Sequence, residues 1–472
     1  MNAVSSRGGN TALYRKIFGW LCLLTVLCPL LRVMLPEDAE VGIMALQLLT
    51  AGMLILLPAT RRKLPVEAKL LAAWFVWNFV TRAAMGDLET GLSGSTLFSA
   101  AAYCIFCMGC VLEGSRRERM LNWLTGIFCG ILLFWSLCGI LTVLKGSSLP
   151  LIRENIFLMD EVQDGHHVRS LAFYNLHRNE TAPWFMVGLW LMVYQWFACK
   201  NRKWRVPIAL TGVVFYVIVA LQHCRTVYLA TAGGFAMLAL LVLMPRSGER
   251  KNIRRWIIAL MAAAVCLGVS YKGFSVCDQV VSRTAQITSR IYCQLRGLEL
   301  PAAEEAFTDD RSLLQDMKTV TGRKSIWRAV YRTRIAYPGL LLAGQREEEI
   351  VPLLMEQGGL KYKVGHVHNM FLQALVETGL PGMALYLTFV VLLVIRMVKL
   401  FFRDWVPLAR RCMTLISATL LVFGMVETLM SRVTWLSSLC LMLAAGLVTG
   451  WERESAAVPE KAAESAGEKA ET

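Results

Sequence analysis

The chain has 472 residues, of which 56% are hydrophobic, and it carries a formal net charge of +15. A soluble protein of this length needs more polar surface to cover its core, so the composition excludes an ordinary soluble globular protein. The basic residues are dispersed in short clusters between apolar blocks rather than gathered in one basic domain, which argues against nucleic acid as a partner.

Apolar blocks long enough to cross a bilayer follow one another along the chain, and each predicts a membrane-spanning helix. The first follows Arg15 and Lys16 and has no small-residue cleavage site after it, so we expect an uncleaved first helix. The sequence therefore predicts an all-α, polytopic integral membrane protein with about twelve transmembrane helices. The expected blocks are 17–35, 41–58, 67–84, 95–113, 121–144, 182–198, 206–221, 226–244, 255–270, 380–402, 408–427 and 432–450.

The short connections alternate between basic and non-basic, and this alternation predicts the orientation. The basic connections include Arg61-Arg62-Lys63, the arginines of 116–119 and the cations of 200–205, whereas 36–40 is acidic. Both termini are therefore expected in the cytoplasm: an N-terminal segment of 1–16, and a tail of 451–472 whose Ala, Glu, Lys and Ser content predicts disorder. Helices one to nine occupy 17–270, and helices ten to twelve occupy 380–450.

Two long connections fall on the outer, non-cytoplasmic side. One is 145–181, and the other, 271–379, is a large extracytoplasmic loop between helices nine and ten. Cys277 and Cys293 lie in the larger loop, where the compartment allows a disulfide, and the sequence leaves open whether they form one.

A pair of histidines stands near the end of the large loop. Asn369 is a plausible N-cap for a short helix, and Gly379 and Pro381 are expected to end that helix before the next span. His366 and His368 then lie at a helix start beside the membrane, where a neutral imidazole can accept a proton near pH 7. The pair could instead supply zinc ligands, but no carboxylate or cysteine completes the set at a useful spacing, so no metal is expected.

This segment resembles the O-antigen ligase/polymerase family of bacterial membrane glycosyltransferases. The late outer loop of that family ends in His-Asn-x-x-Leu followed after six residues by Gly, and the matching residues are His368, Asn369, Leu372 and Gly379. The resemblance extends from about residue 165 to the end of the chain.

Three upstream segments resemble further motifs of the family, in the family's order. They are Arg169…Phe173…Asn179, Cys224-Arg225-Thr226, and Gly322-Arg323…Trp327 with the following Pro338…Gly344. Two departures stand out: Ser170-Leu171 replace a glycine region, and Cys224 occupies the position of a serine.

The resemblance implies the reaction and the partners. Family members act on undecaprenyl-diphosphate-linked glycans at the outer face of the bacterial cytoplasmic (inner) membrane, and they either ligate the glycan to an acceptor or polymerise repeat units. The expected partners are therefore this lipid-linked donor, a glycan, lipid or protein acceptor, and membrane lipids. No cofactor is expected, because arginine can supply the counter-charge to a diphosphate.

The candidate residues divide by role. His368 is the candidate base, with His366 as its rival, and Arg225 and Arg323 are the candidate ligands of the diphosphate. Glu427 and Glu377 could orient these groups. The substrate-binding candidates are Arg169, Asn179, Arg328, His366, Asn369 and Glu377.

Other interpretations remain at this stage. The stretch 325–336 has the pattern of an amphipathic helix on a membrane surface, which would explain its arginines without catalysis. The whole chain could be a transporter or flippase for lipid-linked glycans, although acidic residues are nearly absent from the middle of the spans. It could also be a non-catalytic protein of envelope assembly.

Overall fold

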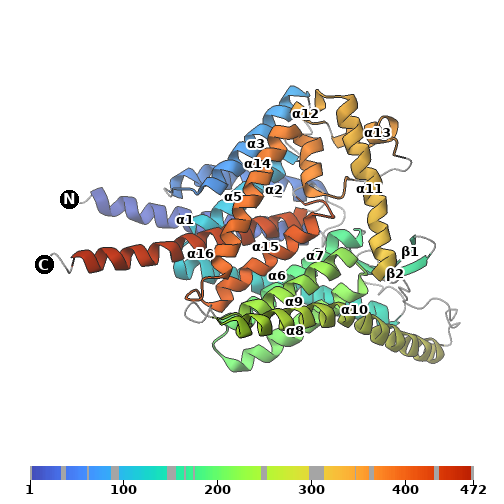
Figure 1. The fold of residues 1–472 in the computed structure, drawn as a ribbon. Coiled ribbons are helices and arrows are strands. Elements are labelled where there is room, and N and C mark those ends of the chain that lie inside the picture. Colours follow the sequence, from blue (N-terminus) through green and yellow to red (C-terminus); the bar gives the residue numbers. More distant parts are fainter. Residues whose placement is uncertain are drawn as a thin grey trace. The chain divides into compact units, whose positions relative to one another are not determined.

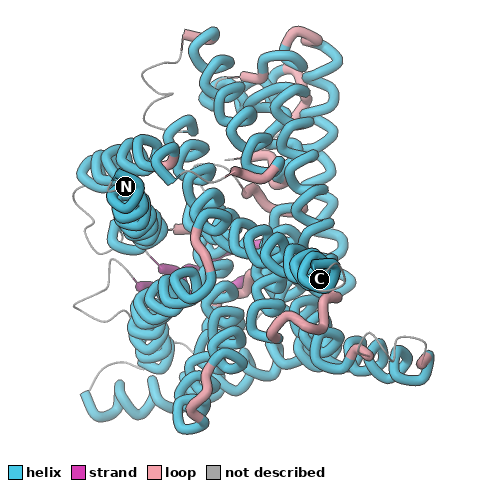
Figure 2. The backbone as a smooth tube through the Cα atoms, turned by 90° about the vertical axis from the view of Figure 1, so that its left-hand side faces the viewer, coloured by secondary structure: helices cyan, strands magenta, loops and turns pink. Residues whose placement is uncertain are grey.

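The computed structural model describes residues 3–32, 39–60, 63–86, 95–145, 156–163, 166–173, 176–245, 252–296, 313–345, 347–360, 366–429 and 435–468. Nearly all of this chain is helical, and the strands drawn in Figure 2 form one small hairpin. The chain divides into two compact units. Unit 1 comprises 1–124, 329–418 and 428–472, and unit 2 comprises 125–328 and 419–427.

Unit 1 holds the helices at both ends of the sequence (Figure 1). Its elements are α1 (Ala3–Arg32), α2 (Ala39–Leu56), a 3-10 turn (Pro58–Thr60), α3 (Val66–Ala84), α5 (Ser95–Val111), the start of α6 (Gly114–Lys145), α12 (Leu340–Ala343), α13 (Glu347–Glu356), α14 (Met370–Phe401), most of α15 (Leu408–Gly424) and α16 (Trp435–Glu468).

Helices α5 and α16 of unit 1 pack backbone to backbone. A Cβ on Gly109 of α5 would lie 2.3 Å from the carbonyl carbon of Gly446, and one on Gly450 would lie 2.4 Å from the carbonyl oxygen of Gly109. Small residues spaced four apart, as Gly446 and Gly450 are, permit this close approach between helices in a membrane. Figure 1 shows how far apart in the sequence the two helices are.

Ion pairs to buried Glu452 hold the middle of α16 in unit 1. Arg396 of α14 donates to Glu67 at 2.8 Å and to Glu452 at 2.5 Å, and Arg403 lies 2.8 Å from Glu452. We expected disorder from residue 451, whereas α16 continues to Glu468. Bound arginines hold Glu452, and the Ala, Glu and Lys that follow are good helix formers, so the helix extends beyond the apolar block.

Unit 2 holds the middle of the chain. Its elements are most of α6, strands β1 (Ile156–Gln163) and β2 (His166–Phe173), α7 (Arg178–Ala198), a 3-10 turn (Arg202–Trp204), α8 (Arg205–Leu221), α9 (Arg225–Leu243), α10 (Ile253–Arg296) and most of α11 (Leu313–Ala336). Helix α7 packs on α8, and α10 packs on α9 and α8. Phe274 of α10 lies between the rings of Tyr216 and Tyr228, with ring centroids 4.4 and 4.3 Å away.

The expected apolar blocks overlap helices. Six helices of the described chain are long and apolar enough to cross a membrane, namely 11–30, 114–145, 202–221, 225–243, 253–295 and 370–401. The structure therefore supports a polytopic membrane protein, and the number of about twelve spans stays a prediction.

The loops contain secondary structure that the sequence did not predict. The antiparallel hairpin of β1 and β2 lies within 145–181, so the described fold is not purely α-helical. The hairpin is anchored because Leu171 and Phe173 are buried and lie where a Cβ on Gly139 of α6 would meet them.

The disulfide that the sequence left open is absent from these described residues. Helix α10 runs to Arg296, and Cys277 and Cys293 are both free cysteines within it. They are sixteen positions apart on one helix, which separates them by about 24 Å along its axis. That separation exceeds the reach of a disulfide several-fold.

Candidate functional site

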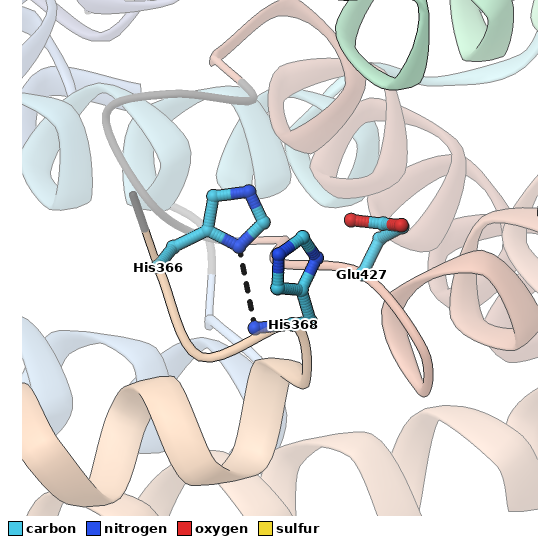
Figure 3. A group of neighbouring side chains, drawn as sticks. All are labelled: His366, His368 and Glu427. Atoms are coloured by element: carbon cyan, nitrogen blue, oxygen red, sulfur yellow. Dashed lines mark hydrogen bonds between the residues drawn. The ribbon is translucent and has the colours of Figure 1, made fainter. Parts of the chain in front are cut away.

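The His366–His368 turn lies in unit 1, directly before α14 (Figure 3). The ring centroids of the two histidines are 4.0 Å apart, and both side chains are partly exposed. The backbone N–H of His368 donates to Nδ1 of His366 at 3.2 Å, which is the dashed line in Figure 3. The hydroxyl of Thr428 lies 2.8 Å from the same Nδ1.

This geometry fixes the tautomer of His366. A backbone N–H can only donate, so Nδ1 of His366 is an acceptor and the proton of its neutral ring is on Nε2.

Two side chains of α14 hold the turn in shape. Asn369 is the N-cap, accepting from the N–H groups of Phe371 and Leu372 at 3.0 Å each, as the sequence predicts. Gln373 accepts from Val367 N–H at 3.2 Å and donates to buried Glu377 at 2.6 Å. Glu377 therefore supports the histidine turn indirectly. It binds Gln373, and Gln373 in turn binds the backbone N–H of Val367, which lies between the two histidines.

His368 has a backbone conformation that side chains rarely adopt. Among the described residues, His223 and His368 are the non-glycine residues with positive φ, and both have φ of 51°. Such a conformation costs free energy, and the surrounding hydrogen bonds must hold it. In Figure 3 the His368 side chain points away from the start of α14, the helix that Asn369 caps.

Gly344 and Gly379 are both in the segments that resemble the ligase motifs, and their backbones meet in unit 1. Gly379 has φ of 69° and interrupts α14, as predicted, and Gly344 has φ of 77°. A Cβ on Gly344 would lie 2.3 Å from the carbonyl oxygen of Glu377, and one on Gly379 would lie 2.4 Å from that of Leu342. Only glycine fits at either position.

Arg334 explains one of the loop arginines without catalysis. It is buried and donates to the carbonyl oxygens of Leu340 and Val376 at 3.2 and 3.1 Å, and burial lowers its pKa to about 10. By contrast, the side chains of Arg328, Tyr331 and Ile335 on the same helix are exposed. This exposed face is compatible with a helix that lies on the membrane surface, so that interpretation of 325–336 stays a prediction.

A second cluster lies in unit 2 and is centred on Glu427. This buried carboxylate pairs with Arg323 of α11 and accepts from Nδ2 of Asn179 at 2.9 Å. The Sγ of Cys224 lies 3.2 Å from Oδ1 of Asn179. The structure thus brings together one residue from each of the three upstream segments that the sequence singled out. Figure 3 draws Glu427, which immediately precedes Thr428 in the chain.

Cys224 is a donor in this cluster and remains a thiol. Burial, and then the nearby charge of Glu427, raise the pKa of Cys224 to about 12. A neutral thiol can donate to Asn179, as the serine hydroxyl that it replaces could, and it is a poor nucleophile at neutral pH. The departure from the ligase motif therefore preserves a hydrogen-bond donor.

Arg225 is the first residue of α9, next to Cys224, which is the N-cap residue. Its neighbour His223 is buried, and Nε2 of His223 lies 3.2 Å from Oδ1 of Asp278 on α10. This pair anchors the turn between α8 and α9 to α10, so the start of α9 has a defined position in unit 2.

Arg169 lies in β2, with its Cα paired to that of Asp160, and its side chain is outside the described part of the chain. No sequence motif pointed to Thr428, Gln373 or Asp278. The partner of each comes from elsewhere in the folded chain or from a backbone group, so no local pattern identifies it.

Glu180, beside Asn179 in the first turn of α7, gives a pH-dependent prediction. Burial raises its pKa from 4.5 to about 7. The folded state therefore holds a proton that the unfolded state releases, so stability falls as pH rises from about 4.5 to 7 and the loss is complete above 7. We expect Glu180→Gln to raise the melting temperature at pH 8 and to change it little at pH 5.

The matched control for this measurement is Glu356→Gln, since Glu356 is exposed. Thermal unfolding of both variants in detergent at the two pH values checks the prediction. An equal effect of Glu180→Gln at pH 5 and pH 8 would contradict the assigned proton.

Comparison with known proteins gives one match. The family model described as O-antigen ligase matches residues 209–387, which include Cys224, Arg225, Arg323 and the His366–His368 turn. No curated protein and no solved structure matched the chain.

Proposed function

Because residues 209–387 match the O-antigen ligase family model, we propose that the chain transfers a glycan from undecaprenyl diphosphate to an acceptor hydroxyl. The proposed location is the outer face of the bacterial cytoplasmic membrane, with both termini in the cytoplasm. The family supports a glycosyltransferase of polysaccharide assembly. The donor, the acceptor class and the orientation are our proposals.

The observation that carries the proposal is the cluster on Glu427. Asn179, Cys224 and Arg323 are 45 to 144 residues apart in sequence, and each was selected only because its segment resembled a ligase motif. Arg323 and Asn179 both contact buried Glu427, and Cys224 contacts Asn179, an arrangement that is not expected of three chance resemblances. It supports a common role for these segments in binding the substrate.

The proposed step moves one glycosidic bond. The acceptor oxygen attacks the anomeric carbon and gives its proton to His368, while the bond from that carbon to the diphosphate oxygen breaks. The electron pair of the broken bond leaves with undecaprenyl diphosphate. Negative charge develops on the diphosphate as this bond breaks, and hydrogen bonds that strengthen with that charge lower the barrier. Removing one such donor lowers the rate by roughly 10²- to 10³-fold.

Arg323 and Arg225 are the proposed donors to the diphosphate. A guanidinium has five N–H donors and stays charged, so Arg323 can bind Glu427 with one edge and a phosphate with another. Glu427 would then orient Arg323. Arg169 and Arg328 are the second choice for the same role. Asn179, His366, Asn369 and Glu377 are the remaining candidates for substrate binding.

Purified full-length protein in phospholipid vesicles, supplied with lipid-linked glycan and a candidate acceptor, tests the reaction. We expect released undecaprenyl diphosphate and a glycan–acceptor product in equal amounts, with heat-denatured protein as the blank. Donor that crosses the bilayer intact would favour a flippase. Donor that neither reacts nor crosses the bilayer with any glycan, lipid or protein acceptor would favour a non-catalytic role in envelope assembly. Either of these two results overturns the proposal.

A further inference from the structure

A cavity of about 430 Å³ lies in unit 1 between α1 and the start of α6. Its wall combines apolar side chains, among them Leu112 and Met120, with four cations and two tryptophans. The volume falls in the range of small-molecule sites in proteins. All of the lining residues precede residue 124, far outside the matched ligase segment, so the cavity is separate from the candidate active site.

Only one of the four cations of this cavity has a counter-ion among the described residues. Arg15 lies 3.9 Å from a carboxylate oxygen of Glu113, and it donates two hydrogen bonds to the carbonyl oxygen of Thr60, at 3.0 and 3.3 Å. The side chains of Lys16, Arg116 and Arg119 line the cavity with no acceptor or carboxylate among the described residues. The neighbouring acid Glu118 is bound to Arg410 at 2.7 Å. The cavity therefore offers three uncompensated positive charges to an external anion.

The rest of the lining points to a lipid. Trp20 and Trp123 are 40% and 57% exposed, and tryptophan is enriched where a helix passes from water into the bilayer. Both helices make that passage here, since their cations immediately precede their apolar stretches. The apolar side chains of Leu13, Leu112 and Met120 form the floor of the cavity. A phosphate at the cationic rim would thus have an apolar surface beneath it for an acyl chain.

We propose that this cavity binds an anionic glycerophospholipid, with its phosphate at Lys16, Arg116 and Arg119. Free phosphate has the same negative charge as a lipid phosphate, but it would leave the apolar side chains of the cavity uncovered. Phosphatidylcholine fills the floor, but its quaternary ammonium adds positive charge to a cationic rim. A net negative headgroup with acyl chains satisfies both parts of the cavity. The positive-inside pattern assigns this lipid to the cytoplasmic leaflet.

Native mass spectrometry of the detergent-purified full-length protein, titrated with phosphatidylglycerol or phosphatidylcholine, tests the proposal. The variant is Lys16→Gln with Arg116→Gln and Arg119→Gln. The matched control removes three exposed cations outside the cavity, Lys200→Gln with Arg202→Gln and Lys203→Gln. We expect the first phosphatidylglycerol molecule to bind the cavity variant at least about tenfold more weakly than it binds wild type. Its affinity for the control variant should stay within about twofold of wild type.

A second variant keeps every charge and fills the space. Ala12 lines the cavity, and Ala12→Trp is expected to weaken the first phosphatidylglycerol about tenfold as well. Equal losses in the cavity variant and its control would show unspecific electrostatics and overturn the proposal. Equal affinity for the two lipids, or displacement of phosphatidylglycerol by inorganic phosphate at millimolar concentration, would overturn it too. These measurements do not depend on the transferase reaction, so the two proposals fail separately.

Discussion

Replacing His368 with asparagine is expected to lower glycan transfer by roughly 10²- to 10⁴-fold, the usual contribution of a general base. The proposed step gives the acceptor proton to His368, and an amide cannot accept it at neutral pH. Transfer to the acceptor in vesicles, and accumulated lipid-linked donor in the native host, both measure the loss. Protein abundance and melting temperature should stay close to wild type.

Asparagine is chosen because His368 has φ of 51°. Asparagine tolerates this left-handed region better than most side chains, so the substitution removes the imidazole with less strain than alanine would add. A loss of transfer with an unchanged melting temperature would then report chemistry rather than unfolding.

His366→Asn is the matched control. An asparagine Oδ1 can take the place of Nδ1, which accepts from the backbone of His368 and lies 2.8 Å from Thr428 Oγ1. We expect a smaller loss, at most about tenfold, because the turn is kept and His368 still accepts the proton. If His366→Asn abolishes transfer while His368→Asn does not, the base is His366. Full transfer in both variants would remove the histidine turn from the mechanism.

Local sequence patterns predicted the local structure around this turn. Asn369 has the side chain of an N-cap and does cap α14, and Gly379 has the conformational freedom that its φ of 69° requires. These features depend on residues within a few positions of each other. The apolar blocks are likewise local, which is why each overlaps a helix.

Features that depend on distant partners were not predictable. The hairpin of β1 and β2 is stabilised by packing near Gly139. Helix α10 continues past its apolar block, where Asp278 lies 3.2 Å from His223 and the hydroxyl of Thr288 donates to the carbonyl oxygen of Leu144 at 2.6 Å. Glu452 is a tail residue by composition, yet two arginines of another helix bind it. Sequence periodicity carries no record of such contacts.

The candidate site divides in the same way. The residue types for proton transfer and phosphate binding could be selected from the motifs, and Glu427 and Glu377 could be named as orienting acids. The sequence could not say which group each acid binds. Arg334 and Arg323 are eleven positions apart on α11, and only the folded chain separates the one that binds backbone carbonyls from the one that binds Glu427. Glu427 itself follows α15 without any motif around it.

The ion pair of Arg323 and Glu427 allows a structural role to be separated from substrate binding. Arg323→Gln leaves a buried carboxylate without its counter-charge, which is expected to destabilise unit 2 by about 3–5 kcal/mol. Transfer would be lost for that reason alone. Adding Glu427→Gln removes the stranded charge, while a glutamine oxygen can still accept from Asn179. The double variant should therefore regain most of the melting temperature.

Transfer by the double variant decides the role of Arg323. If Arg323 binds the diphosphate, transfer stays at least about 10²-fold below wild type although the protein is stable. Arg323→Lys keeps the charge but loses the planar fork, so we expect a stable protein with weaker donor binding. The control is Arg410→Gln with Glu118→Gln, a more exposed arginine–glutamate pair in unit 1, which should leave transfer near wild type. Recovery of both stability and transfer in the Arg323–Glu427 double variant would make Arg323 a structural partner of Glu427 and shift the diphosphate to Arg225.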